Sequence, residues 1–266
     1  MQSILCFGDS NTWGLNPRDN SRFDDQTRWT GLLDNLLRPF GKRIIEEGLC
    51  GRTTQFHDWY RKNRCGLDAF PLLLESHSPL AGVVIMLGTN DCKTCFHASA
   101  EQIAEGVRQL VRQAKHAGVP EILVVSPIVL GHGVAQFDGE FNEDSVALSH
   151  RLKATYASVA AEEGCRFLAA SDVAFPSLED REHMNEDGHR ALSEAVFRQL
   201  LAAQKEAPLK GELAAARLTE GSSSGSAVRS SCSSCPHMLS RYACQNATDW
   251  GLRLVRACST FWNAPA

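Results

Sequence analysis

The first residues able to do chemistry stand at the end of a short apolar run, residues 4–7, which is followed by Gly8, Asp9 and Ser10. We interpret the run as a buried strand that delivers Ser10 to the carboxyl end of a parallel sheet, where open α/β proteins place their chemistry. A serine hydroxyl in that place is a candidate nucleophile. The alternative is that Asp9 or Ser10 only caps a following helix.

A serine attacks at neutral pH only when a base takes its proton and an acid orients that base. Two acid–histidine pairs compete for these roles near the predicted last helix. Asp187 and His189 are two residues apart within the first helical turns, so their side chains point to different sides. Asp180 and His183 lie three apart in the preceding loop, where both can turn toward the sheet edge. We predict that Asp180 and His183 complete a triad with Ser10.

An acyl-transfer site also needs hydrogen-bond donors for the negative charge that develops on the carbonyl oxygen, each worth about 3 kcal/mol of barrier. Three donors are predicted: the backbone N–H of Ser10, the backbone N–H of Gly51 and the side-chain amide of Asn90. Gly51 lacks a side chain that would obstruct a substrate, although a glycine there fits a plain turn equally well.

The neighbours of the candidate nucleophile are predicted to line the substrate pocket. They are Asp9, Asn11 and Trp13. The ring of Trp13 either forms a wall of the acyl pocket or packs under the following loop, and the sequence favours neither.

Alternating strand and helix patterns must position these residues. Apolar runs predict strands over residues 4–7, 43–47, 83–87, 122–125 and 166–169, and apolar faces predict helices over 29–37, a short segment ending at 76, 100–117, 145–163 and 186–203. Strands that are apolar throughout form parallel sheets covered by helices on both faces. We predict a five-stranded α/β/α fold with the flavodoxin-like strand order 2-1-3-4-5, in which Ser10 and Asn90 flank the crevice.

Four separated blocks together resemble the SGNH (GDSL-type) hydrolases: residues 8–10, Gly51, residues 88–91 and residues 180–183. Residues 9–14, 28–31 and 46–54 further resemble the arylesterase and acyltransferase branch. The resemblance runs to about residue 205. It implies a three-layer hydrolase that cleaves short acyl or aryl esters through an acyl-enzyme without a metal or other cofactor. It also implies a homo-oligomer and acyl transfer to alcohols.

The block that holds the predicted base departs from the family pattern. Family members usually carry Asp-Gly-Ile-His or Asp-Gly-Val-His, whereas this chain has Arg181 and Glu182 between Asp180 and His183. Two bulky charged residues leave the triad itself intact. We expect them to alter the turn of the loop or the electrostatics beside His183 and to lower activity.

Cysteines offer the alternative function. Cys92 and Cys95 form a Cys-x-x-Cys pair directly after Asn90, and such a pair at a helix start can do redox chemistry when a thiol pKa is lowered. This pattern allows a non-catalytic or thiol-redox protein on the same fold. The hydrolase interpretation already explains the position, so we favour it.

Composition excludes several classes of protein. The net charge is -4 and the chain has no long basic run, so we predict no nucleic-acid partner. No apolar run approaches the length of a membrane span, so we predict no membrane partner. The chain opens directly on a strand pattern, which predicts no signal peptide, a cytoplasmic location and ten cysteines that stay reduced. The expected partner is a small-molecule ester.

Composition also divides the chain into a catalytic domain, residues 1–206, and a tail, residues 207–266. A Gly/Ser stretch over residues 221–226 predicts a linker, and the cysteine-containing remainder predicts a disordered appendage. The tail could ligate zinc through Cys232, Cys235, His237, Cys244 and Cys258. Their spacing is irregular and lacks a matching second pair, so we predict no metal site.

Overall fold

In the computed structural model, the backbone is described for residues 1–219 and the side chains for residues 1–202. Five parallel strands form one sheet in the order β2-β1-β3-β4-β5. They are β1 (Gln2–Gly8), β2 (Lys42–Gly48), β3 (Gly82–Met86), β4 (Ile122–Ser126) and β5 (Arg166–Ala169). The predicted α/β fold and its strand order are confirmed.

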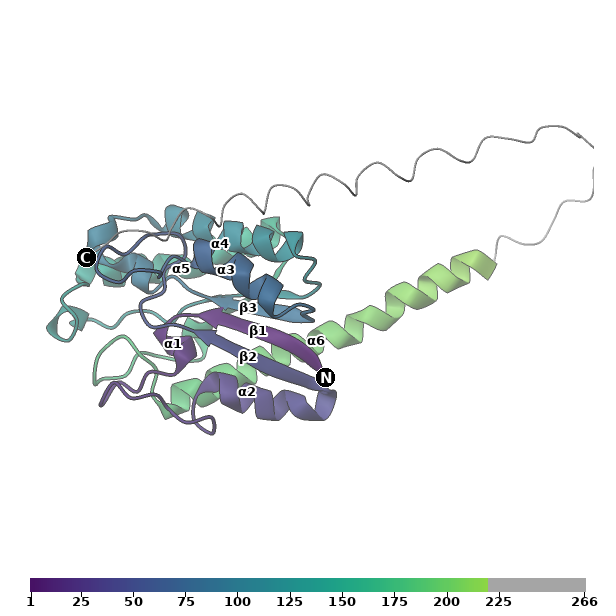
Figure 1. Cartoon of the computed structure of the whole chain (residues 1–266), viewed down its shortest axis with the longest axis horizontal. Coiled ribbons are helices and arrows are strands. Elements are labelled where there is room, and N and C mark those ends of the chain that lie inside the picture. Colours follow the sequence, from purple (N-terminus) through teal and green to yellow (C-terminus); the bar gives the residue numbers. More distant parts are fainter. Residues whose placement is uncertain (220–266) are drawn as a thin grey trace, which may run out of the picture. The chain divides into compact units, whose positions relative to one another are not determined.

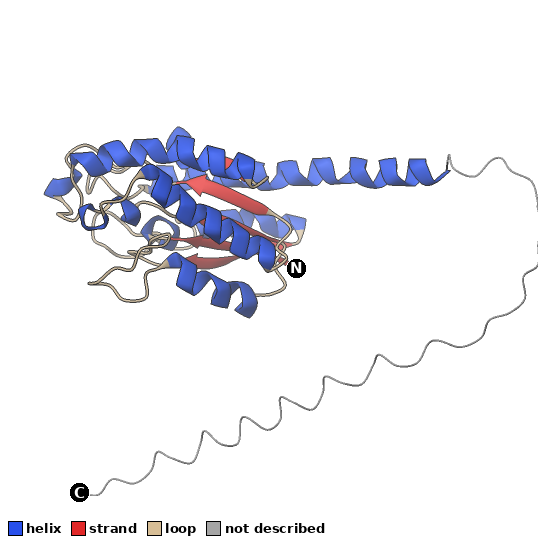
Figure 2. Cartoon of the chain, turned by 90° about the horizontal axis from the view of Figure 1, so that it is seen from above, coloured by secondary structure: helices blue, strands red, loops and turns tan. Residues whose placement is uncertain are grey.

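Helices cover both faces of this sheet and make three layers (Figure 1). One face is covered by α3 (Gly66–Ser76), α4 (Ala100–His116) and α5 (Glu143–Glu162), and the other by α2 (Trp29–Leu37) and α6 (Glu186–Thr219). From above, the axes of the helices lie roughly along the strands (Figure 2). Short helices occupy loops between these elements: α1 (Ser10–Trp13), η1 (Arg38–Phe40), η2 (Asn90–Cys92), η3 (Thr94–Phe96), η4 (Val134–Gln136) and η5 (Ala170–Asp172).

Strand β1 shows why the apolar runs are continuous. Successive side chains of a strand point to opposite faces, and both faces of this sheet are buried. Leu5 and Phe7 pack in the core under α3, α4 and α5, while Ile4 and Cys6 pack in the core under α2 and α6. Each residue of β1 after its first is therefore buried, whichever face of the sheet its side chain points to.

The carboxyl ends of β1, β2 and β3 lie side by side, because Gly8 pairs with both Gly48 and Met86. The glycines at these ends let α1 pack directly on the sheet. A Cβ on Gly8 would lie 2.0 Å from Thr12 Oγ1, and one on Gly48 would lie 2.2 Å from the backbone nitrogen of Trp13. Strand β1 lies between β2 and β3, and all three strands are parallel. The loops that follow them therefore meet at one edge of the sheet.

The last helix differs from its prediction. Sequence patterns end it at residue 203, before Pro208, whereas α6 continues to Thr219. The added segment is rich in Ala, Leu, Glu and Lys, which favour helix. The compact unit that contains the sheet runs from Met1 to Ala215. The predicted linker and zinc-type cysteines of the tail lie outside the described residues, and the boundary at 206 stays a prediction.

The helices of the structure lie within residues 1–219. Not one of these helices has an apolar stretch long enough to cross a bilayer.

Candidate active site

Ser10 is the first residue of α1, directly after β1. Asp9 caps this helix, since its side-chain Oδ1 accepts a hydrogen bond of 3.0 Å from the backbone N–H of Asn11. The two interpretations of this stretch therefore hold together: Asp9 is a cap, and the same turn presents the Ser10 hydroxyl at the strand end. The backbone N–H of Ser10 belongs to the first helical turn, where N–H groups lack a partner inside the helix.

A chain of hydrogen bonds joins Ser10 to His183 and Asp180. His183 Nε2 lies 2.7 Å from Ser10 Oγ, and His183 Nδ1 lies 2.6 Å from Asp180 Oδ2. Asp180 Oδ1 also accepts the backbone N–H groups of Glu182 at 3.0 Å and of His183 at 2.9 Å. One carboxylate thus folds the loop and orients the imidazole. In the tautomer with its proton on Nδ1, His183 leaves Nε2 free to accept the serine proton.

Electrostatics around the imidazole favour its protonated form. Burial on its own lowers the pKa of His183, but the charges of Glu182 and Asp180 outweigh it, and the pKa lies above its usual value. Burial on its own raises the pKa of Asp180, but the hydrogen bond and charge of His183 outweigh it, and that pKa lies below its usual value. The arrangement of the pair therefore favours an imidazolium at His183.

The competing histidine has a structural position. His189 is fully buried in α6, and its Nδ1 accepts a hydrogen bond of 3.3 Å from the backbone N–H of Trp29. Burial lowers the pKa of His189 to about 3, so the ring stays neutral. Asp187 is exposed on the same helix. Asn185 caps α6 by accepting the backbone N–H of Gly188 at 2.9 Å.

Two of the three predicted oxyanion donors, Gly51 and Asn90, belong to the loops after β2 and β3, and two hydrogen-bonded links join these loops. The Asn90 side-chain amide donates to the carbonyl of Arg52 at 3.2 Å. Asp91 accepts from the backbone N–H of Thr54 at 2.9 Å and from its hydroxyl at 2.5 Å. Gly51 has φ +83°, which a residue with a side chain adopts only with strain. The links fix the Gly51 turn relative to Asn90.

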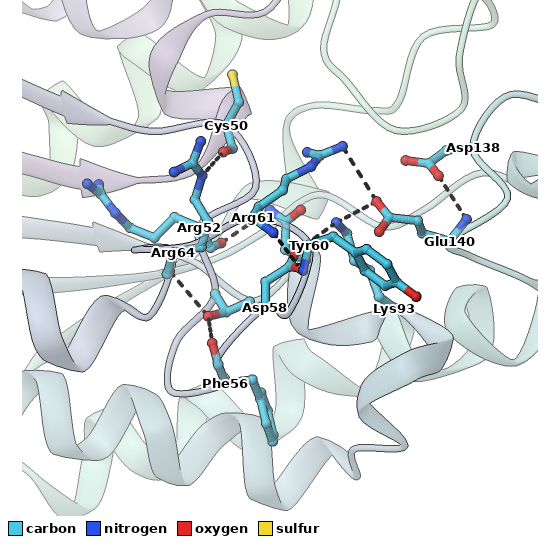
Figure 3. A network of polar contacts seen from close by, with 12 residues as sticks. Cys50, Arg52, Phe56, Asp58, Tyr60, Arg61, Arg64, Lys93, Asp138 and Glu140 are labelled. Atoms are coloured by element: carbon cyan, nitrogen blue, oxygen red, sulfur yellow. Dashed lines mark hydrogen bonds and ion pairs between the residues drawn. The ribbon is translucent and has the colours of Figure 1, made fainter.

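A polar network supports the loop after β2 from behind (Figure 3). Arg64 Nε donates to the carbonyl of Cys50 at 2.8 Å, directly before the Gly51 turn. Farther along, the ammonium of Lys93 is buried and donates to Glu140 at 2.7 Å, and Arg61 lies 3.6 Å from the same carboxylate. The contact of Arg61 with Glu140 ties the loop after β2 to the segment before α5.

Asn11 connects the nucleophile turn to the loop of the predicted base. Its Nδ2 donates to the carbonyl of Glu182 at 3.4 Å, and its Oδ1 accepts the backbone N–H of Met184 at 3.0 Å. The residue between these two in sequence is His183, so Asn11 fixes the backbone on both sides of the base. Nothing in the motif itself signals this contact, although an amide beside a nucleophile is able to make one.

The predicted substrate contacts of Asp9, Asn11 and Trp13 stay predictions. Asp9 and Asn11 are buried and use their side chains in the bonds just described. Trp13 is partly buried, and the guanidinium of Arg22 lies over its ring at 5.4 Å from the centroid. That contact fits the interpretation in which the Trp13 ring packs under the following loop. The alternative, that the ring forms a wall of the acyl pocket, stays a prediction.

The Cys-x-x-Cys pair has little redox character. Cys92 is buried and its thiol donates to the carbonyl of Gly88 at 3.4 Å. Burial raises the pKa of Cys92 well above its usual value, and burial also raises the pKa of the exposed Cys95. Both cysteines are free thiols. A redox pair needs a lowered thiol pKa, so the geometry favours a structural role for Cys92.

Side chains able to hold a metal ion gather elsewhere among the described residues. Ligand atoms of His57, Cys65 and Asp68 lie within 4.8 Å of one another at the start of α3. His57 and Asp68 are mostly exposed, and none of the three belongs to the hydrogen-bonded chain of Ser10.

Comparison with known proteins decides the family. The model of the GDSL-like lipase/acylhydrolase family matches residues 6–191. The chain belongs to this family. No curated protein sequence matches the chain.

Solved structures extend this result to ester-cleaving enzymes. A carbohydrate acetylesterase from Sinorhizobium meliloti is 35% identical, with a TM-score of 0.72 over 76% of this chain and 100% of that chain. An inhibitor-bound aryl esterase from M. smegmatis is 34% identical, with a TM-score of 0.71 over 76% of this chain and 99% of that chain. A lipase/acylhydrolase from Enterococcus faecalis, 18% identical with a TM-score of 0.53 over 75% of this chain and 95% of that chain, shares the fold. Family and neighbours support ester hydrolysis.

The departure of this GDSL-like acylhydrolase from its family pattern has a visible structural form. Arg181 has φ +64°, the left-handed region, where a glycine fits without penalty and a residue with a Cβ costs about 1 kcal/mol or more. The turn is thus the one a glycine would make, and Arg181 adopts it under strain. Glu182 stands where the family carries an apolar residue, and it is only 7% exposed.

Proposed function

We propose that this GDSL-like acylhydrolase is a serine esterase that cleaves short-chain acyl or aryl esters through an acyl-enzyme. The hydrogen-bonded chain from Ser10 through His183 to Asp180 is the observation that carries the proposal. Membership of the family and the two ester-cleaving neighbours support it.

In the proposed mechanism, His183 Nε2 takes the proton of Ser10 while Oγ attacks the ester carbonyl. Asp180 holds the imidazole and stabilises its positive charge. The oxyanion is stabilised by the backbone N–H groups of Ser10 and Gly51 and by the amide of Asn90. His183 then gives the proton to the leaving alcohol, and the C–O bond of the ester breaks to leave acyl-Ser10.

Deacylation repeats the same proton transfers with a new nucleophile. His183 takes a proton from water, the water oxygen attacks the acyl carbonyl, and Ser10 leaves with the proton. An alcohol in place of water gives acyl transfer, which we propose as a second outcome of the same intermediate. No step needs a metal or other cofactor.

The test is pre-steady-state hydrolysis of p-nitrophenyl acetate. We expect a burst of nitrophenol equal to the enzyme concentration, because acylation releases the phenol before water attacks. Ser10→Ala should abolish the burst, whereas Ser76→Ala, at an exposed position at the end of α3, should retain it. Undiminished turnover by Ser10→Ala would overturn the proposal.

The thiol-redox alternative is tested on the same preparation. The double variant Cys92→Ala/Cys95→Ala should keep the burst, since neither thiol touches the chain of Ser10. Loss of the burst in this variant, with folding intact, would favour the alternative.

We also propose a homo-oligomer in the cytoplasm, as the resemblance and the sequence imply. Light scattering of the purified full chain measures the oligomer size, and fractionation of the source cells measures the location. A monomer at micromolar concentration would contradict the first part.

A further inference from the structure

Glu182 places a second carboxyl against the imidazole. Its Oε1 lies 3.6 Å from His183 Nε2, the same nitrogen that lies 2.7 Å from Ser10 Oγ. The side chain is only 9% exposed. Backbone contacts on both sides hold it there, because the N–H of Glu182 donates to Asp180 and its carbonyl accepts from Asn11. Asp180 therefore serves one edge of the ring, and Glu182 faces the other.

The stereochemistry of ester cleavage assigns this position to the alcohol part of the substrate. The leaving oxygen receives its proton from His183 Nε2 and must come within hydrogen-bond distance of it. The carbonyl oxygen points instead toward the donors of Gly51 and Asn90. A carboxyl 3.6 Å from Nε2 therefore lies within reach of the leaving alcohol.

Within the described residues, no hydrogen-bond donor contacts the carboxyl of Glu182. It accepts no hydrogen bond there, and its one ion-pair contact is His183. Other carboxyls surround it: Asp9 follows β1, Asp138 precedes α5, and Asp180 shares its loop. Burial and these like charges raise the pKa of Glu182 to about 7, although His183 opposes the shift. When His183 is neutral, the carboxylate lacks a counter-ion.

The neighbouring arginine does not supply that counter-ion. The stem of Arg181 packs on Gly131, because a Cβ on Gly131 would meet the Cβ and Cδ of Arg181 at 3.1 Å. A buried carboxylate without a cation or hydrogen-bond donor is costly, so it takes up a proton or binds a cation from outside. A substrate whose alcohol part carries a positive charge would provide that cation at the moment when His183 must be neutral.

We propose that Glu182 is a specificity-determining residue that binds a cationic group on the alcohol part of the ester. The inference rests on the proposed function and adds a substrate class to it: short acyl esters of alcohols that carry an ammonium group. The Val or Ile usual at this position in the family has no charge to offer. The proposed selectivity therefore comes from Glu182, the residue at which this chain differs from the family pattern.

The test compares two acetate esters of almost the same shape. Acetylcholine carries a quaternary ammonium, and 3,3-dimethylbutyl acetate has carbon in place of that nitrogen. The measurement is kcat/KM for each ester at pH 8, by titration of the acetic acid released. We expect the wild type to favour acetylcholine by at least about tenfold, which corresponds to about 1.4 kcal/mol. Glu182→Gln and Glu182→Val should bring this ratio to about one.

A matched control removes a carboxylate from the same loop without touching the imidazole. Glu179 accepts from the hydroxyl of Ser177 at 2.5 Å and faces Arg18, so Glu179→Gln should keep the wild-type ratio. A wild-type ratio near one overturns the inference. So does a ratio that Glu182→Gln leaves unchanged while the acid limb of its pH profile moves, because Glu182 then acts on His183 alone.

The two proposals fail in different ways. If the wild type shows no Ser10-dependent burst with p-nitrophenyl acetate, the proposed function fails. If the burst occurs but neither acetate ester of the matched pair is hydrolysed, the proposed function stands and the substrate class is wrong.

Discussion

Asp180→Asn separates the orienting role of Asp180 from its role in folding the loop. The amide Oδ1 of asparagine can still accept the backbone N–H groups of Glu182 and His183, at 3.0 and 2.9 Å in the native loop. The amide nitrogen takes the place of Oδ2, which lies 2.6 Å from His183 Nδ1. Because that nitrogen donates, Nδ1 must become the acceptor, and the ring proton moves to Nε2.

The exchange leaves a protonated Nε2 facing the hydroxyl of Ser10 at 2.7 Å, where it can no longer take the serine proton. A Ser-His-Asp site that holds the wrong tautomer loses about 10⁴ in kcat, or about 5 kcal/mol of transition-state stabilisation. The assay is steady-state hydrolysis of p-nitrophenyl acetate, with the melting temperature as a check of folding. The matched control is Asp187→Asn on the exposed side of α6, which should keep full activity.

If folded Asp180→Asn stays within about tenfold of the wild type, Asp180 does not set the tautomer of His183. If Asp187→Asn loses activity instead, the competing acid–histidine pair is the functional one and the assignment of the base is wrong.

Three further predictions concern the oxyanion, the pH profile and the sheet edge. Asn90→Ala should lower kcat by about 10²–10³ with little change in KM, because it removes one donor that acts in the transition state; a KM effect alone would contradict this. Because the base must be neutral and the pKa of His183 is raised, log kcat/KM should fall with decreasing pH at a midpoint above 6.5; a midpoint below that value would contradict the charge arrangement. Gly8→Ala should lower the free energy of unfolding by about 3 kcal/mol in urea melts, because its Cβ would lie 2.0 Å from Thr12 Oγ1. Gly139→Ala, which meets no atom within 4 Å, is the control for that substitution and should change little.

The sequence predicts the fold well because burial on both faces leaves a simple pattern. Strand β3 (Gly82–Met86) is a run of Val, Ile and Met that no amphipathic helix would have, and α2 begins and ends at its predicted residues, Trp29 and Leu37. The predicted end of α6 was wrong, because the helix-forming residues beyond residue 203 outweigh Pro208 and the helix continues to Thr219. Local preference decides such ends, and the two preferences conflict there.

The candidate site was predictable where residue type alone limits the options. A serine at a strand end needs a base, and two Asp–His pairs near the last helix competed for that role, so Ser10, Asp180 and His183 could be named. The contacts of Asn11 could not be predicted, because they depend on a loop 171 to 173 positions away in the sequence. The direction of Glu182 was equally hidden, because its side chain is aimed by a turn that a glycine normally makes.

The long-range contact of Asn11 has a consequence for the timing of activity during synthesis. Domains fold as units while the chain emerges, and the nucleophile turn emerges first. Ser10 lacks its hydrogen-bond partner His183 until the loop of that residue is made, 173 positions later. If Ser10 acts as proposed, an incompletely synthesised chain does not hydrolyse esters. Hydrolysis then begins only when the loop before α6 packs against the end of β1. The first turnover therefore shows that the N-terminal and C-terminal parts of the sheet domain are in contact.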